Sequence, residues 1–250
     1  MHTNQTSFVT NLLFWNGSLN FEYTSIFIVL SKKITSFYDI GANTGYYSLL
    51  ATTINPKLNA IAFEPAHGPL HYLTKNVQSS SHSDRIQVKP LAISDSNTTI
   101  PFQEVVNHKY KEVVHNLSGE GNLVNKKTRK NFKVTNVKTL TLDKLVETGN
   151  RPPDLIKVDT EGAEMKVLRG GYDTISKYRP IIICEVLSQN RAIEIHEFIG
   201  QVIEYKSFGL MKKRIVPLSL KGEWNKEIKD MILIPNEKTH LIKEFLEAKK

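Results

Sequence analysis

Cysteine is almost absent from this sequence, which contains one, Cys184, within an apolar segment. A single cysteine cannot form an intramolecular disulfide, so a disulfide-stapled fold is excluded. Long apolar runs are also missing, since the apolar stretch at residues 21–30 is far shorter than the roughly 20 residues of a membrane-spanning helix. The first residues carry no positively charged region of the kind that begins a signal peptide. These absences predict a cytoplasmic protein.

Histidines with metal-ligand spacing are lacking too. His67 and His71 begin a predicted helix with no further ligand beside them, and His108 and His115 are isolated in a loop, where they are candidate general bases or simply solvated. The net charge is +8, but the basic residues are scattered or gathered in the run 126–130 and at the C-terminus. Aromatic residues do not interleave with them, so no nucleic-acid partner is expected.

What the sequence does contain is typical of one α/β domain. It has 250 residues, of which 40% are hydrophobic and 23% charged. This length and composition allow a sizeable core under a charged surface.

Residues 37–50, FYDIGANTGYYSLL, contain the pattern around which the chain is organised. Their apolar start predicts a strand, Gly41 and Gly45 predict a sharp turn, and a helix begins at Tyr46. Such a turn brings backbone N–H groups and a helix N-terminus beside a ligand. The spacing differs from the Gly-x-Gly-x-x-Gly of dinucleotide enzymes, and Asp39 would repel a pyrophosphate but suit the cationic groups of S-adenosylmethionine. The pattern favours S-adenosylmethionine over NAD, with a purely structural turn as the alternative.

Two later segments add to this prediction. Residues 59–63, NAIAF, read as a second buried strand, and Glu64 follows it at about the offset, some 20 residues, where such folds bind a ribose diol. A third strand at residues 85–90 leads to Asp95, which would lie near a purine edge. A plain turn aspartate explains Asp95 almost as well.

Acidic residues gather at two further strand ends. Asp159, Glu161 and Glu164 lie within six residues at a strand–helix junction, and Glu185 ends another apolar strand. Glu164 suits the positive N-terminus of the helix, whereas the others should face the crevice. Such carboxylates can bind a substrate hydroxyl, act as a base or hold a divalent cation. Because separate loop positions do not make a metal-binding spacing, we predict no metal.

Several segments together resemble the FkbM family of S-adenosylmethionine-dependent methyltransferases. They are, in order, YDIGANTGYYSLLA, AIAFEP, LAISD, VKTLTLDKLV, DLIKVDTEGAEMKVLRGG and RPIIICEV. The pairing of D-x-G-A-N-x-G with K-x-D-x-E-G-A-E is specific. The resemblance implies an α/β fold with a Rossmann-like, doubly wound, mostly parallel seven-stranded sheet, an antiparallel last hairpin and helices on both faces. It also implies methyl transfer to a hydroxyl oxygen, often on a sugar or natural product.

The resemblance implies a role for each matching position. For the cofactor these are Asp39, Gly41, Asn43, Gly45 and Tyr46 around the methionine end, Glu64 at the ribose, and Ile93 with Asp95 at the adenine. Asp159 and Glu161 would lie beside the reactive methyl group. They are the preferred base or acceptor-orienting groups, and Glu185 is a weaker third.

The same resemblance suggests how the chain is divided. Residues 37–236 would form the methyltransferase domain, with residues 97–137 as a substrate-side insertion. Residues 1–36 would be a cap or edge segment, either a helix across the sheet or an edge hairpin. Residues 237–250 would close the chain as a helix or tail.

Other functions stay open from the sequence. An NAD-linked oxidoreductase is disfavoured by the glycine-loop spacing. A nucleic-acid methyltransferase is suggested only by the net charge, and a catalytically silent S-adenosylmethionine-binding module would keep the same fold. The acceptor, expected to be a small molecule or glycan, is not identified, and neither is the oligomeric state.

Overall fold

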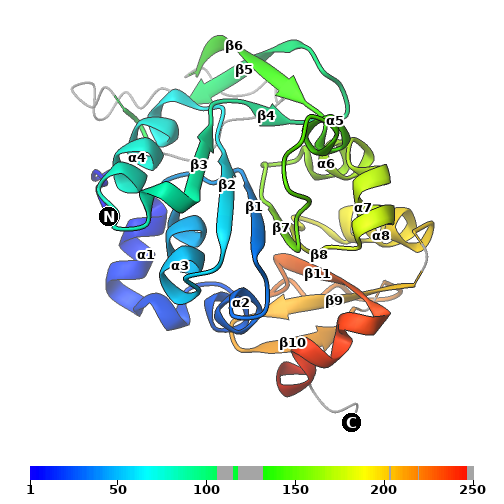
Figure 1. The fold of residues 1–250 in the computed structure, drawn as a ribbon. Coiled ribbons are helices and arrows are strands. Elements are labelled where there is room, and N and C mark those ends of the chain that lie inside the picture. The colour runs from blue at the N-terminus through cyan, green and yellow to red at the C-terminus, as the bar shows by residue number, and fades with distance from the viewer. Residues whose placement is uncertain (106–114, 118–131, 203, 219, 247–250) are drawn as a thin grey trace.

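The computed structural model describes residues 1–105, 115–117, 132–202, 204–218 and 220–246. Figure 1 shows a central twisted sheet between two layers of helices, with a small separate sheet above it. In the described part of the chain, every helix is too short or too polar to span a bilayer.

The main sheet has eight strands in the order β10-β9-β11-β8-β7-β1-β2-β3. Their bounds are β1 Ser36–Ile40, β2 Asn59–Phe63, β3 Ile86–Lys89, β7 Leu155–Val158, β8 Ile181–Glu185, β9 Tyr205–Met211, β10 Arg214–Pro217 and β11 Asp230–Pro235. The five adjacent strands β8, β7, β1, β2 and β3 are parallel to one another. Strand β11 runs antiparallel to both β8 and β9. The predicted mostly parallel α/β sheet with a reversed last hairpin is therefore confirmed, with β10 as an additional edge strand.

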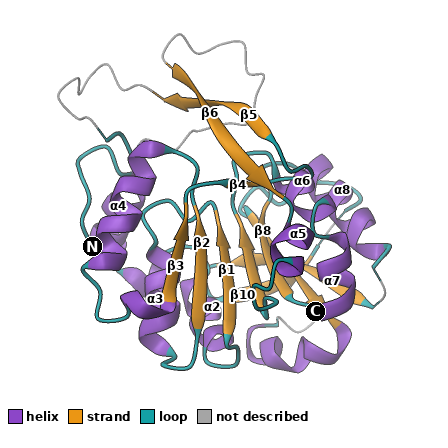
Figure 2. Ribbon diagram, turned by 45° about the horizontal axis from the view of Figure 1, so that its top comes forward, coloured by secondary structure: helices purple, strands orange, loops and turns teal. Residues whose placement is uncertain are grey.

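Two hydrophobic cores cover the two faces of this sheet. Along β1, Phe37 packs into one core and Tyr38 into the other, because successive side chains of a strand point to opposite faces. Helices α2 Thr24–Ser31, α3 Tyr46–Ile54 and α4 His67–Gln78 cover the first face. Helices α5 Leu142–Glu147, α6 Glu164–Arg169, α7 Tyr172–Tyr178 and α8 Gln189–Gly200 cover the second (Figure 2). Short 3-10 segments complete this framework at Ser83–Arg85 (η2) and Asn236–Phe245 (η4).

The N-terminal segment is helical. It forms α1 Phe8–Asn16 and η1 Ser18–Asn20 before α2, so of the two alternatives for residues 1–36 the edge hairpin is wrong. Ser7 caps α1, because its hydroxyl accepts a hydrogen bond from the N–H of Thr10. Gly17, with φ of +75°, ends α1. The predicted alternative, the edge hairpin, would have had its turn at this position.

A three-stranded sheet stands above the main sheet in Figure 1. It consists of β4 Ala92–Ile93, β5 Thr99–Val105 and β6 Phe132–Leu140, in the order β4-β6-β5. Strand β5 and the start of β6 lie within residues 97–137, the expected substrate-side insertion. The basic run at 126–130 and His108 lie outside the described residues.

Candidate functional site

A cavity of about 690 Å³ opens at the carboxyl ends of β1, β2, β7 and β8. In parallel α/β sheets this is the edge where ligands bind, and the volume is typical of a small-molecule site. Of the predicted site residues, eight line it: Gly41, Asn43, Tyr46, Glu64, Ile93, Asp159, Glu161 and Glu185. The strand ends of the sheet therefore bring together residues that lie far apart in the sequence.

The glycine loop after β1 is held tightly against the rest of the protein. Gly41 has φ of +73°, and a Cβ at this position would lie 1.8 Å from the carbonyl oxygen of Asp159. The N–H groups of Gly41 and Ala42 both donate to the carbonyl oxygen of Phe63 at 3.0 Å. These N–H groups are thus used inside the protein, and Gly41 is needed for the close approach of β1 to β7.

Glu64 is placed to bind a ligand through both carboxylate oxygens. Its Oε2 accepts from the N–H of Asn43 at 2.8 Å, and its Oε1 accepts from the N–H of Ala66 at 2.9 Å. Each oxygen keeps a lone pair for a further donor. Burial raises the pKa of Glu64 to about 7, although the two N–H donors favour its charged form.

Three predicted cofactor residues do not line the cavity. Asp39 is buried at the end of β1, where its Oδ2 accepts from the N–H and hydroxyl of Ser48 at 3.2 and 2.7 Å. Gly45, with φ of +86°, begins α3 and packs against Leu73. Asp95 is exposed on the turn after β4 and does not line the cavity, so contact of Asp95 or its backbone with a purine stays a prediction. Asp39 and Gly45 thus support the glycine loop through contacts within the protein and do not line the cavity.

Asp159, Glu161 and Glu185 form a carboxylate cluster, with one oxygen from each lying within 4.8 Å of the others. Burial, and then the charges of Asp159 and Glu161, raise the pKa of Glu185 to about 9. Glu185 is therefore protonated at neutral pH and can donate a hydrogen bond to a ligand, since its Oε2 has no hydrogen-bond partner among the described residues. Glu164 does not face the cavity, because its Oε1 accepts from the N–H groups of Thr160 and Gly162 and so orders this loop.

A buried lysine that the sequence analysis did not single out completes the cluster. The Nζ of Lys157, on β7, lies 3.1 Å from Asp159 Oδ2, 3.8 Å from Asp39 Oδ1 and 3.3 Å from the carbonyl oxygen of Gly41. Burial alone would lower the pKa of Lys157, but Asp159, Asp39 and Glu22 raise it above its ordinary value. This ammonium already supplies a cation to the cluster. The expectation that no metal is needed stays a prediction.

The N-terminal segment supplies a second wall that the sequence did not reveal. Thr6, Val9, Phe21 and Glu22 line the cavity together with the strand ends that the motifs had indicated. Leu117 joins them, because its N–H donates to the hydroxyl of Thr6 at 2.8 Å. No motif marks these positions, since they belong to segments brought to the cavity only by folding.

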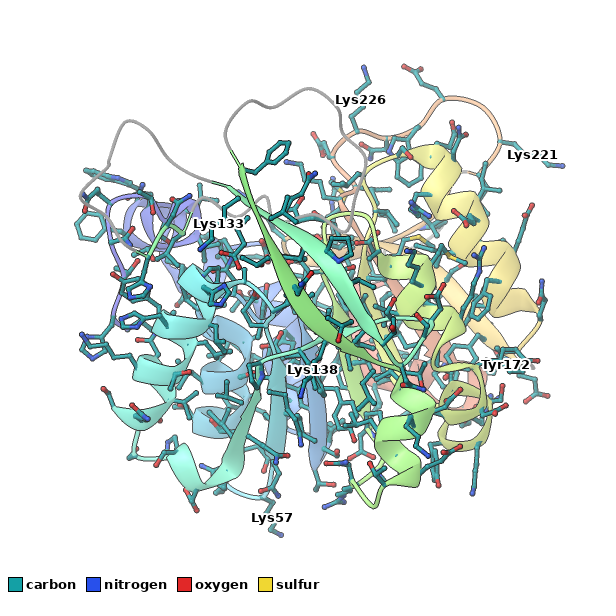
Figure 3. All side chains as sticks on the ribbon, turned by 90° about the horizontal axis from the view of Figure 1, so that it is seen from above. Lys57, Lys133, Lys138, Tyr172, Lys221 and Lys226 are labelled. Atoms are coloured by element: carbon teal, nitrogen blue, oxygen red, sulfur yellow. The ribbon has the colours of Figure 1, made fainter. Side chains whose placement is uncertain are left out.

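The remaining candidates lie away from this chemistry. His115, named as a candidate base, stacks on His71 with ring centroids 3.7 Å apart and does not line the cavity. Figure 3 shows five labelled lysines on separate parts of the surface, namely Lys57, Lys133, Lys138, Lys221 and Lys226. The expectation that the chain has no nucleic-acid partner stays a prediction.

Comparison with known proteins identifies the domain. The model of the methyltransferase FkbM domain matches residues 39–212, which carry the glycine loop, Glu64 and the carboxylate cluster. The chain belongs to the FkbM methyltransferase family. In this FkbM protein, Glu22 and the other N-terminal wall residues lie outside the matched residues 39–212.

Two relatives share part of its length. Hexuronic acid methyltransferase AglP of Haloferax volcanii is 31% identical over 151 residues, which are 58% of this chain and 54% of AglP. Methyltransferase sdnD of Sordaria araneosa is 26% identical over 153 residues, which are 53% of this chain and 58% of sdnD. The chain thus spans about half the length of the curated relatives it matches.

A solved structure supports the fold. The FkbM methyltransferase of Methylobacillus flagellatus KT superposes with a TM-score of 0.52 and 14% identity, covering 80% of this chain and 43% of that one. At this identity the likeness concerns the fold alone.

Proposed function

We propose that this chain transfers a methyl group from S-adenosylmethionine to a hydroxyl oxygen of a sugar or a related small-molecule acceptor, and that a hexuronic acid is the first acceptor to test. The observation that carries the proposal is the cavity itself. It contains Glu64 with free lone pairs and, from the ends of β7 and β8, three clustered carboxylates. The relative AglP supports the choice of acceptor.

The residues present fit S-adenosylmethionine. The lone pairs left on Glu64 suit the two hydroxyls of a ribose. Pro65 and Leu91, which line the cavity beside Ile93 and are half-buried, offer apolar surface for a purine ring. Thr44 also lines the cavity, and its buried hydroxyl has no hydrogen-bond partner among the described residues, which leaves a polar group for the ligand.

In this mechanism the bound cofactor supplies an electrophilic methyl group, and the protein orients the acceptor. Asp159 or Glu161 accepts the proton of the acceptor hydroxyl at a carboxylate oxygen, and protonated Glu185 donates a hydrogen bond that holds the acceptor. Lys157 keeps Asp159 in place through the 3.1 Å contact. Positioning of the two reactants then provides much of the rate.

Calorimetric titration with S-adenosylmethionine and S-adenosylhomocysteine tests the cofactor first. We expect saturable binding that is weakened at least tenfold in Glu64→Ala. Labelled methyl transfer to methyl β-D-glucuronide and methyl β-D-glucoside then tests the acceptor class. Absence of cofactor binding to folded protein would overturn the proposal. Binding without transfer to any hydroxylated acceptor would indicate a silent binding module.

A further inference from the structure

Glu22 is held rigidly in the N-terminal wall of the cavity. Its neighbours Phe21 and Tyr23 are only 4% and 2% exposed. The ring of Phe21 meets that of Tyr46 at 5.3 Å, and Tyr23 stacks on Tyr47 at 5.1 Å. Because both neighbours are anchored, the intervening Glu22 side chain turns towards the cavity that it lines.

One oxygen of Glu22 is engaged and the other is free for a ligand. The hydroxyl of Tyr47 donates to Oε2 at 2.7 Å. Within the described part of the chain, Oε1 accepts no hydrogen bond from protein. A carboxylate oriented through one oxygen can accept a donor from a ligand at the other.

The backbone of Glu22 is in a strained, positive-φ conformation. Five non-glycine residues of the described chain have positive φ, and three of them, Glu22, Asn43 and Glu161, line this cavity. The φ of Glu22 is +41°, in the region that favours glycine. Strained residues of this kind gather at functional sites when the surrounding structure fixes them.

The charges around Glu22 place it at the end of the cavity where the carboxylate cluster lies. Glu22 interacts electrostatically with Lys157, Asp159 and Lys229. Lys229 lies beside the end of β8, because its carbonyl oxygen accepts from the N–H of Val186. Glu22 thus faces the region where the acceptor hydroxyl would lose its proton.

We propose that Glu22 is an acceptor-binding residue that sets specificity, with Oε1 accepting a hydrogen bond from a second hydroxyl next to the one that is methylated. The inference rests on the proposed methyl transfer to a sugar. It assigns recognition of a polyhydroxylated acceptor to the N-terminal segment, outside the region matched by the family.

The test compares Glu22→Gly with Glu204→Gly. Both replace an exposed glutamate of positive φ, but only Glu22 lines the cavity. Glycine is chosen because it accepts this backbone conformation, so both variants should fold. We expect Glu22→Gly to raise the KM for methyl β-D-glucuronide by about 10- to 100-fold, the value of a hydrogen bond to a charged group. The Kd of S-adenosylmethionine should stay within about twofold of the wild type, and Glu204→Gly should change neither quantity.

Acceptors lacking one hydroxyl give the decisive comparison. With the wild type, one monodeoxy analogue of methyl β-D-glucuronide should be a poorer substrate, whereas Glu22→Gly should no longer distinguish this analogue from the parent sugar. A Glu22→Gly variant with wild-type KM and wild-type discrimination would overturn the role of Glu22 alone. If Glu22 only supported Tyr47, the variant would lose stability and cofactor affinity while keeping its discrimination. A wild type that binds the cofactor but methylates none of these sugars would overturn the proposed acceptor class together with this inference.

Discussion

At the scale of single residues, Lys157 shows how a buried charge can be tolerated in the centre of the sheet. It is 4% exposed, and Asp39, its register partner on β1, is 1% exposed with no hydrogen bond to Oδ1. Removing one member of a buried ion pair leaves the other without compensation. We expect Lys157→Met to lower the free energy of unfolding by about 3–5 kcal/mol, as measured by urea denaturation.

The double variant Lys157→Met/Asp39→Asn is the control. It removes both charges, so it should recover most of the stability that the single variant loses. If the double variant is no more stable than Lys157→Met, the main partner of the lysine is Asp159 and not Asp39.

Glu64 should make stability depend on pH in an identifiable direction. Its pKa is raised from 4.5 to about 7 in the folded protein. The folded state therefore binds the proton more strongly than the unfolded state does. The resulting contribution to the free energy of unfolding is fully present below pH 4.5 and is lost as pH rises through 7. Between pH 4 and 8 we expect the wild type to lose about 3 kcal/mol more than Glu64→Gln, from unfolding curves at several pH values.

Glu237 offers a control of opposite sign. Its hydrogen bonds with Arg179 lower its pKa from 4.5 to about 2. The stability that Glu237 contributes is therefore lost only as pH falls below 4.5. Glu237→Gln should leave the profile between pH 5 and 8 unchanged. An unchanged profile in Glu64→Gln as well would show that another group titrates in this window.

The sequence predicted the site residues that belong to local motifs. Glu64 and Asp159 end strands whose apolar patterns are clear, so their place at the cavity followed from topology. Lys157 was missed although its spacing of two from Asp159 puts both on one face of β7. Glu22 had no local signal at all, because its position depends on how the N-terminal segment packs.

At the scale of elements, the junction of β1 and β7 depends on Gly41. An added Cβ would overlap the carbonyl oxygen of Asp159, and φ is +73°. We expect Gly41→Ala to cost about 3 kcal/mol or more, from the strained backbone and the overlap together, and to weaken cofactor binding in calorimetry.

Gly149 separates these two causes. Its φ is +93°, but a Cβ there would meet nothing within 4 Å. Gly149→Ala should cost about 1 kcal/mol, the effect of the backbone alone. Equal costs at both glycines would mean that the β1 and β7 ends can move apart.

Elements with strong apolar patterns were predicted closely, and those without were not. Residues 59–63 were expected as a strand and form β2, and the helix expected to begin at Tyr46 is α3. The edge strand β10 was missed because Arg214–Pro217 is short and half polar. The N-terminal helices were ambiguous for a similar reason, since Asn16-Gly17 serves equally as a hairpin turn or a helix end.

At the scale of the whole molecule, the N-terminal segment belongs to the main core. Phe21, Tyr23, Ile26, Phe27 and Leu30 are each at most 4% exposed. Their burial contributes on the order of 10 kcal/mol, which is comparable with the total stability of a domain. We expect a fragment of residues 36–250 to lack a cooperative unfolding transition in calorimetry.

Exposed residues of the same segment provide the contrast. Phe14 and Trp15 are 77% and 79% exposed, so serine at both positions should change the free energy of unfolding by less than about 0.5 kcal/mol each. A cooperative transition in the fragment would show that residues 36–250 fold without this segment, which would then be a cap on an independent domain.

The cavity wall runs from Thr6 to Lys229, so it draws on almost the full length of the chain. During synthesis, at about 5–20 residues per second, the N-terminal wall residues emerge well before β11, the strand that follows Lys229. The complete cavity therefore forms only after this strand has left the ribosome. A ligand that contacts the whole cavity can stabilise the chain only from that stage of synthesis onwards.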